Sequence, residues 1–199
     1  MPTLLRTNGS LSLTAKKYKD KLLGFVLAVS DDFTLIQIFD HDYFNLDGYC
    51  IFENDSVKKF RVYDDEEYFL AEVVKKKKVK PRPVSGVSLE SWATILQTVN
   101  DNFNLVVVES ENIYKNQSNI GRLEKVGKKT FSLIEIYTDA YWDEKPTKYK
   151  LKNLTKVSFN NAYENTLWNI SESRKKNVKQ ISLNSVFSTT KNFIRIYEQ

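Results

Sequence analysis

The chain has 199 residues, and its 30 lysines and arginines against 25 aspartates and glutamates give a formal net charge of +5. A hydrophobic share of 41%, with 13% aromatic residues, is enough to bury a core and excludes an intrinsically disordered chain. The uncharged stretches are too short to cross a bilayer, and one cysteine allows no internal disulfide, so we expect a cytoplasmic protein. The single histidine argues against a histidine-based metal site.

The charge is distributed unevenly along the chain. Residues 31–74 carry twelve acidic against three basic residues, whereas residues 75–82 carry six basic residues. Residues 101–199 carry 16 basic against 11 acidic residues. A uniformly basic nucleic-acid-binding protein would not alternate in this way. The pattern favours parts of opposite charge that face each other or face a protein partner.

Short runs rich in isoleucine, valine, phenylalanine and tyrosine predict β-strands in the first 63 residues. A helix is then predicted to begin after Asp64 or Asp65 and to run through Val74, with four lysines at its end. Pro81 and Pro83 end it and begin a linker. The strands are predicted within residues 11–14, 23–29, 33–39, 49–53 and 57–63.

The remaining chain is predicted to continue with a helix and a second set of strands. Ser88 caps the helix from Leu89 to Val99, in which apolar side chains recur on one face at helical spacing. A weaker helix is predicted to pass through Ile170, and residues 178–199 are apolar enough to add a strand or two. The second set of strands is predicted within residues 105–109, 120–126, 133–137 and 154–159.

The second set of strands repeats the first, which indicates an internal duplication. The offset is 97 residues for the first and last matching runs and 98 for the middle two, so one-residue slips are expected in the turns. A repeat of this length is too long for a stacked solenoid unit and predicts two similar modules. The matching runs are 23–29 with 120–126, 35–39 with 133–137, 43–44 with 141–142, and 57–62 with 154–159.

The repeated pattern of strand, glycine, polar turn, strand and Asp-Gly resembles the Sm-like small β-barrels. More narrowly, the chain resembles uncharacterised bacterial proteins built from two such modules joined by a helix. The resemblance implies a mainly β fold of the α+β class, with two antiparallel barrel-type modules, and it implies no activity. The runs that carry it are 24–27, 46–49, 57–60, 120–123, 153–159 and 163–164. The expected divisions are a first module at 10–77, a linker and helix at 78–100, a second module at 101–173, and a C-terminal extension at 174–199 packed on the fold.

The RNA pocket of the Sm-like family does not carry over to this chain. The family places an aspartate and an apolar-Asn pair between its second and third strands, and a basic residue with glycine between its fourth and fifth. Phe44-Asn45 resembles the family's apolar-Asn pair, but neither Asp40 nor Asp42 stands at the position of the family's aspartate. No basic residue followed by glycine comes after the strand at 57–62 or its counterpart, and the acidic loop would repel phosphates.

The cluster that most resembles a catalytic or metal site comprises Asp40, His41 and Asp42, with Asp47 nearby. Two carboxylates could orient an imidazole or hold a cation. The simpler interpretation is a solvated hairpin loop. Cys50, in a predicted strand without a base beside it, is expected to be a buried structural thiol. We therefore expect no catalytic residue, no metal and no cofactor.

Two basic regions could bind an anionic partner. The run from Lys75 to Lys80, with Arg82, could bind anionic lipid or nucleic acid, or could be a helix end that enters an exposed linker. The second module interleaves basic and aromatic residues, which can follow a nucleic-acid backbone and stack bases, or can be solvated strand faces. This second group comprises Arg122, Lys125, Lys128, Lys129, Lys148, Lys150 and Lys156 beside Tyr137, Tyr141, Trp142 and Tyr149.

The leading hypothesis from the sequence is a non-catalytic protein-interaction module that does not enter a membrane. The equivalent turns carry opposed charges, and aromatic pairs recur at equivalent loop positions. The expected interaction surface comprises Asp31, Asp32, Tyr43, Phe44, Tyr141 and Trp142. The alternative is RNA or single-stranded DNA binding through the second module, by Arg122, Lys125, Lys128 and Lys129.

Overall fold

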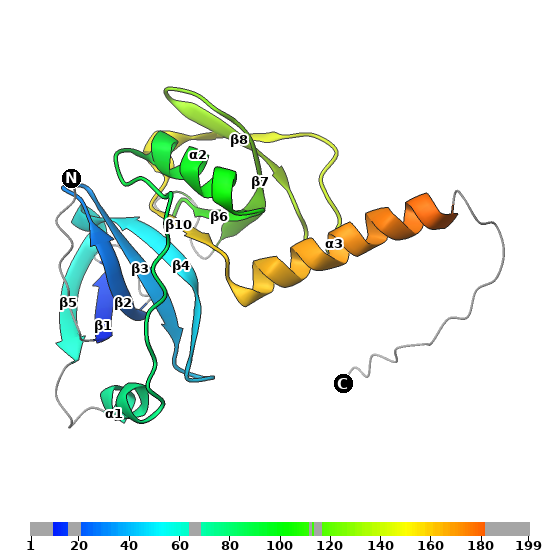
Figure 1. Cartoon of the computed structure of the whole chain (residues 1–199). Coiled ribbons are helices and arrows are strands. Elements are labelled where there is room, and N and C mark those ends of the chain that lie inside the picture. Colours follow the sequence, from blue (N-terminus) through cyan, green and yellow to red (C-terminus); the bar gives the residue numbers. More distant parts are fainter. Residues whose placement is uncertain (1–9, 16–20, 64–68, 112, 114–116, 182–199) are drawn as a thin grey trace, which may run out of the picture.

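The computed structural model describes residues 10–15, 21–63, 69–111, 113 and 117–181, and over these the fold is mainly β, of the α+β class. The described residues form one antiparallel sheet of ten strands and three α-helices (Figure 1). Among these residues no helix is long and apolar enough to cross a membrane. The strands are β1 (Ser10–Ala15), β2 (Lys21–Val29), β3 (Phe33–Asp40), β4 (Asn45–Glu53), β5 (Val57–Tyr63), β6 (Val106–Glu109), β7 (Ser118–Val126), β8 (Thr130–Glu135), β9 (Thr147–Lys150) and β10 (Lys156–Phe159). The helices are α1 (Phe69–Lys76), α2 (Trp92–Asn102) and α3 (Ala162–Ile181).

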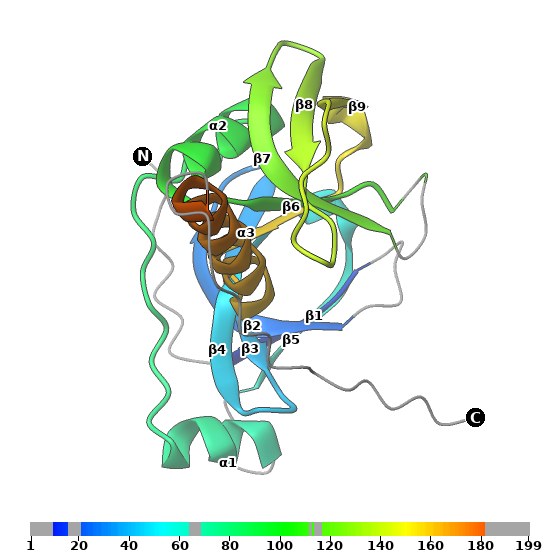
Figure 2. The same ribbon diagram turned by 90° about the vertical axis from the view of Figure 1, so that its right-hand side faces the viewer.

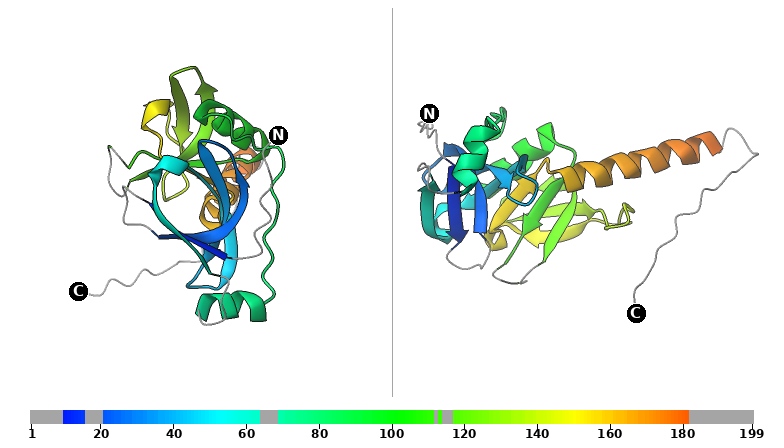
Figure 3. Two further views of the ribbon diagram at one scale, coloured as in Figure 1. Left: turned by 90° about the vertical axis from the view of Figure 1, so that its left-hand side faces the viewer. Right: turned by 90° about the horizontal axis from the view of Figure 1, so that it is seen from below.

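The strand order follows the same pattern in both halves of the chain. It runs β5-β1-β2-β3-β4 in the first half and β10-β6-β7-β8-β9 in the second, so in each half the last strand lies beside the first. β4 pairs with β10 and joins the two halves into one sheet. The strands of the first half curve round in an arc (Figures 2 and 3). β5 and β9 are the outer strands of the sheet.

The pairing registers among β2, β3 and β4 recur among β7, β8 and β9 at a constant offset of 97 residues. Both the β2–β3 register and the β3–β4 register of the first half recur in the second half at that offset. The one-residue slip that the sequence comparison placed between these strands is therefore absent from their pairing. Examples are Gly24–Ile38 with Gly121–Glu135, and Leu35–Ile51 with Ser132–Lys148.

A glycine stands at the same point of β2 and of β7 because the neighbouring strand comes very close there. A Cβ atom on Gly24 would lie 2.2 Å from the carbonyl oxygen of Gln37, and one on Gly121 would lie 2.4 Å from that of Ile134. Both distances are far below a van der Waals contact, and the neighbouring atom is backbone in each case. Only glycine therefore fits at either position.

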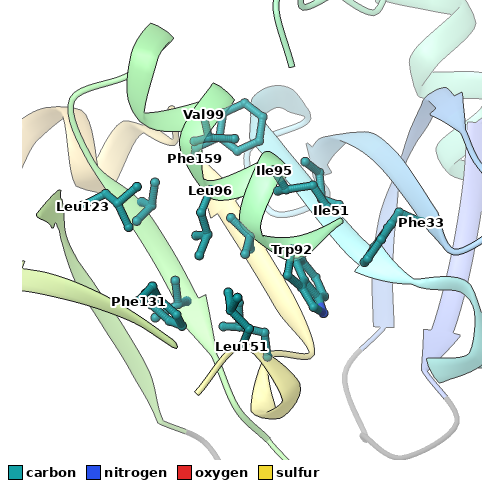
Figure 4. Packing of buried hydrophobic residues seen from close by; sticks show 14 of the residues in the cluster. Phe33, Ile51, Trp92, Ile95, Leu96, Val99, Leu123, Phe131, Leu151 and Phe159 are labelled. Carbon is teal, nitrogen blue, oxygen red and sulfur yellow. The ribbon is translucent and has the colours of Figure 1, made fainter. Parts of the chain in front are cut away.

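One large apolar core is shared by α2 and both halves of the sheet (Figure 4). α2 contributes its apolar face, and the ring of Trp92 lies edge-on to that of Phe33, with 4.8 Å between the ring centroids. The two modules expected from the sequence therefore do not have wholly separate cores. The buried residues shown in Figure 4 include Phe33, Ile51, Trp92, Ile95, Leu96, Val99, Leu123, Phe131, Leu151 and Phe159.

A partly buried ion pair lies where the two halves join. The Lys156 ammonium on β10 is 2.9 Å from a Glu109 carboxylate oxygen on β6 and 3.9 Å from one of Glu111. Burial lowers the pKa of Lys156, but the Cys50 thiol and the two carboxylates outweigh it and raise the pKa above its ordinary value. Cys50 is fully buried on β4, as expected, and desolvation raises the pKa of its thiol to about 12.

α2 differs from its predicted bounds. α2 begins at Trp92, and its N-terminal cap is Ser91, whose hydroxyl accepts a hydrogen bond from the Thr94 N–H at 3.2 Å. The prediction of Ser88 as the cap is wrong because the helix begins three residues later than expected, at Trp92, whose ring packs against Phe33. α1 begins at Phe69, and the predicted caps Asp64 and Asp65 lie outside the described residues.

The last helix is much longer than the sequence predicts. α3 extends for 20 residues, and its C-terminal end projects beyond the strands (Figure 1). Residues 178–181, predicted as part of a strand-forming tail, belong to this helix. The rest of that tail, residues 182–199, lies outside the described residues. Leu167 is buried against Leu105 and Ile136, and this contact holds α3 on the second half of the sheet.

Candidate functional site

The six residues of the expected interaction surface do not form one surface. Asp31 and Asp32 precede β3, whereas Tyr43 and Phe44 follow it. The eight residues of β3 separate these turns by about 23 Å, at 3.3 Å per residue step. Tyr141 and Trp142 lie in the second half, beyond β8. The structure therefore divides this set into three separate places.

The Asp40–His41–Asp42 segment is a turn closed by its own carboxylate. One Asp40 oxygen accepts hydrogen bonds from the backbone N–H groups of Asp42 and Tyr43, at 2.9 and 3.1 Å. The His41 side chain is 66% exposed and lies 3.5 Å from an Asp42 oxygen. Asp47 instead accepts a hydrogen bond from the N–H of Ala162, at the start of α3. Within the described residues, no group of three or more His, Cys, Asp or Glu side chains could hold a metal ion.

The basic residues of β7 and β9, in contrast, share one face of the sheet. Leu123 and Leu133 point into the core, so their neighbours along the strands point outward. Ser132 on β8 lies between Lys125 on β7 and Lys148 on β9, in one row across three strands. Both lysines are exposed. We call this surface the basic face: Arg122, Lys125, Lys128, Lys129, Lys148 and Lys150.

The turn between β7 and β8 extends the basic face at one end. Lys128 and Lys129 are exposed there, and the turn is closed by the Gly127 N–H, which donates to the Thr130 carbonyl at 2.8 Å. Glu124, at the register shift in β7, is also exposed. Because Lys128 and Lys129 project from a tight hairpin, they can approach a ligand that lies along the strands. The four residues proposed from the sequence for nucleic-acid binding are thus contiguous.

The other end of the basic face meets a cluster of aromatic rings. Arg122 lies over the ring of Trp142, 5.7 Å from its centroid, and Lys175 of α3 lies 5.4 Å from the same ring. Trp168 of α3 meets Trp142 edge-on at 6.1 Å. Such cation–ring contacts are favourable and become stronger when water is excluded. Trp142 is therefore held between a strand and the last helix.

Tyr141, the neighbour of Trp142, carries the most accessible ring of this group. Its side chain is 60% exposed, and the Arg174 guanidinium lies 4.4 Å from the ring centroid. Arg174 also donates a hydrogen bond to the backbone carbonyl of Asp139, which fixes it beside the ring. We call Tyr141, Trp142 and Trp168, with Arg122, Arg174 and Lys175, the aromatic cluster.

One polar atom of the aromatic cluster has no partner. The indole N–H of Trp142 is buried, and it has no hydrogen-bond acceptor among the described residues. A buried donor left unpaired is costly, by about 1–3 kcal/mol. This cost is part of holding the Trp142 ring between a strand and the last helix.

Two residues that the sequence grouped with the basic face lie elsewhere. Lys156 is buried in the ion pair between the halves, because β10 is a central strand of the sheet. Tyr149 is half-buried, with its ring stacked on Phe131 at 5.3 Å and its hydroxyl hydrogen-bonded to Glu135. Tyr137 is 51% exposed, and its hydroxyl donates to Asp143 at 3.1 Å.

Sequence reasoning missed the α3 members of the aromatic cluster. Trp168 and Lys175 are seven residues apart, two turns along one helix face. The helical spacing of Trp168, Ser171 and Lys175 was the available signal, but the prediction ended this helix before Ser171. The cluster exists only because α3 continues past that point.

The first turn of α3 contains a buried carboxylate, that of Glu164. Glu164 is 4% exposed, one of its oxygens accepts a hydrogen bond from the Asn161 amide at 2.9 Å, and the other has no partner among the described residues. Burial raises the pKa of Glu164, and the nearby Asp47 carboxylate adds to the effect. The ionised form is therefore disfavoured in the folded protein.

We expect Glu164→Gln to stabilise the protein increasingly as pH rises. The folded-state pKa lies above 4.5, so wild-type stability falls as pH rises from that value through the folded pKa, and the glutamine variant lacks this loss. At pH 7.5 the gain should be about 1 kcal/mol, the scale of a buried unpaired polar group. Urea denaturation from pH 4 to 8 measures it, with the exposed Glu90→Gln as control. Parallel pH profiles for wild type and Glu164→Gln would contradict the expectation.

Comparison with known proteins gives no relative from which a function could be transferred. No family model, curated protein or solved structure matches the chain. What the basic face and the aromatic cluster can do must therefore be argued from their own chemistry.

Proposed function

We propose that each half of the chain is an Sm-like module and that the two arose by duplication. Three observations support this. The strand order is the same in both halves, the β2–β3 and β3–β4 registers recur at one offset, and a sterically required glycine recurs at the same point. Few side chains are the same in the two halves. The features that they share are features of the backbone, such as the close approach that requires a glycine.

We further propose that the protein is a non-catalytic binding protein for single-stranded nucleic acid, RNA or DNA. The observation that carries this is the continuity between the basic face and the aromatic cluster, through Arg122. Lysines along a strand face neutralise phosphates, and exposed rings stack unpaired bases. A protein interface would instead be expected to be poor in lysine at its centre.

The two parts of the site have different roles in this proposal. Lys125, Lys128, Lys129 and Lys148 bind the phosphate backbone without reading its sequence. Tyr141, whose side chain is 60% exposed, offers a ring on which a base can stack beside the Arg174 guanidinium. Single strands are favoured over duplexes because paired bases do not expose their faces to a ring.

The test is a fluorescence anisotropy titration with labelled single-stranded RNA and DNA at several salt concentrations. The double variant Lys128→Glu/Lys129→Glu should weaken binding at least about tenfold and reduce the salt slope by about 1.4, for two lost phosphate contacts. The matched control Lys75→Glu/Lys76→Glu makes the same charge change in the first half and should bind as wild type. No binding at low salt, or equal losses for both variants, would overturn the proposal.

Protein binding is the second candidate. It rests on the exposed Asp31 and Asp32 in the turn equivalent to that of Lys128 and Lys129. The Asp31–Asp32 turn is well fixed, because Asn54 donates hydrogen bonds to the carbonyls of both aspartates at 3.0 and 2.8 Å. A partner captured from host lysate by wild type and lost from Asp31→Lys/Asp32→Lys would support it, whereas an unchanged set of captured proteins would exclude this surface.

A further inference from the structure

A second exposed surface lies in the first half, at the turn between β3 and β4. Tyr43 is 75% exposed on this turn, and Phe69, the first residue of α1, is 61% exposed. The ring of Phe44, the neighbour of Tyr43 in the chain, lies 5.8 Å from that of Phe69 and edge-on to it. We call Tyr43, Phe44 and Phe69 the aromatic tip.

Basic residues lie immediately beside the aromatic tip. Lys77 lies over the Phe44 ring, 5.5 Å from its centroid, and donates a hydrogen bond to the Phe44 carbonyl at 3.5 Å. α1 ends in Lys75 and Lys76, and Lys78 and Lys80 follow. All of these lysines are exposed.

α1 itself has an apolar face that the described residues cover only in part. Phe69, Leu70, Val73 and Val74 recur at helical spacing, yet no residue of α1 is buried. Of these four, Phe69 is the most accessible. A short helix with apolar residues on one side and lysines at its end has the composition of a helix that rests at a lipid interface.

The aromatic tip is remote from the basic face. α1 lies at one end of the molecule and the β7–β8 hairpin at the other, in two views at right angles (Figures 1 and 2). A ligand bound along β7–β9 would therefore leave the tip free. Neither the proposed nucleic-acid site nor the second candidate uses it.

We propose that the aromatic tip and the lysines around α1 form a docking surface for an anionic lipid bilayer. Tyrosine and phenylalanine rings partition into the headgroup region, and lysines are attracted to anionic headgroups, each raising affinity about fivefold. The aromatic tip projects from the β3–β4 turn and from the start of α1, so it can contact a broad, flat surface such as a bilayer. Peptide recognition more often uses a groove that receives side chains.

Nearby acidic groups weaken this attraction only in part. Glu72 is paired with Lys76 at 2.7 Å, and Asp42 lies beside His41. The acidic run at 64–67 precedes α1 in the sequence and lies outside the described residues. The axial length of α1, from Phe69 to Lys76, is about 10 Å, beyond the Debye length of about 8 Å at physiological salt. The charges of the lysines at the C-terminal end of α1 are therefore largely screened from charges at its N-terminal end.

The test is co-sedimentation of the full chain with phosphatidylcholine vesicles that do or do not contain phosphatidylglycerol. We expect binding to the anionic vesicles only. Phe69→Ser and Tyr43→Ser should each weaken it roughly tenfold, since each removes a ring that would enter the interface. Lys75→Glu/Lys78→Glu should abolish it. Thermal melting of each variant checks that the fold is intact, as expected for such exposed positions.

Two controls separate this surface from the rest of the molecule. Tyr163→Ser removes a ring that is 50% exposed on α3 and should bind vesicles as wild type. Lys128→Glu/Lys129→Glu should also keep vesicle binding, and Phe69→Ser should keep nucleic-acid binding. No sedimentation with anionic vesicles, equal binding to both vesicle types, or undiminished binding by folded Phe69→Ser would each overturn the proposal.

Discussion

Replacing Gly24 by alanine is expected to destabilise the protein by about 3 kcal/mol, and replacing Gly121 should do the same. The added methyl group would lie 2.2 or 2.4 Å from a carbonyl oxygen of the facing strand. Backbone cannot move aside as a side chain can, so two paired strands must separate. Urea denaturation followed by circular dichroism measures the loss.

Gly127 provides the matched control for these two substitutions. It lies in the β7–β8 turn, where a Cβ atom would be 3.4 Å from the Thr130 oxygen, an ordinary contact. Gly127→Ala should therefore change the free energy of unfolding by no more than about 0.5 kcal/mol. If all three alanine variants were equally stable, the close approach at Gly24 and Gly121 would be refuted.

Replacing Lys156 by methionine is expected to cost about 3 kcal/mol of stability. The side chains of Lys156, Glu109 and Glu111 are only 13%, 17% and 9% exposed. Without the ammonium, two neighbouring carboxylates remain where water reaches them poorly. β10 connects the two halves of the sheet, so the loss acts at their junction.

Two further variants test the cause of that loss. Lys152→Met removes an exposed lysine from the 3-10 helix at Leu151–Asn153, between β9 and β10, and should be nearly neutral. Lys156→Met/Glu109→Leu replaces the 2.9 Å pair by apolar groups and should recover part of the stability. If the double variant were less stable than Lys156→Met alone, an unpaired Glu109 carboxylate would not be the cause of the loss, and this explanation would be contradicted.

Much of the β-structure could be predicted from the sequence because it depends on local residue types. Runs of β-branched and aromatic residues mark the strands, and Gly24 and Gly121 mark the same close approach in each half. The helix bounds were less predictable. Ser88 and Ser91 are both good caps, and only the packing of Trp92 against Phe33 selects Ser91.

The candidate site could be predicted only where its residues are close in sequence. Arg122, Lys125, Lys128 and Lys129 lie on one strand and its turn, so they remain together in the fold. Lys156 was grouped with them by composition, but strand order places it in the interior. The contacts of Arg174 and Lys175 with the aromatic rings depend on where α3 docks, which no local pattern specifies.

The most direct test of the central claim is ultraviolet crosslinking of the intact protein to a single-stranded oligonucleotide, with the crosslinked residues identified by mass spectrometry. Aromatic rings stacked on bases crosslink most readily, so we predict crosslinks at Tyr141 or Trp142, suppressed by competing unlabelled strand. Crosslinks confined to the first half of the chain, with none in residues 118–150, would contradict the account.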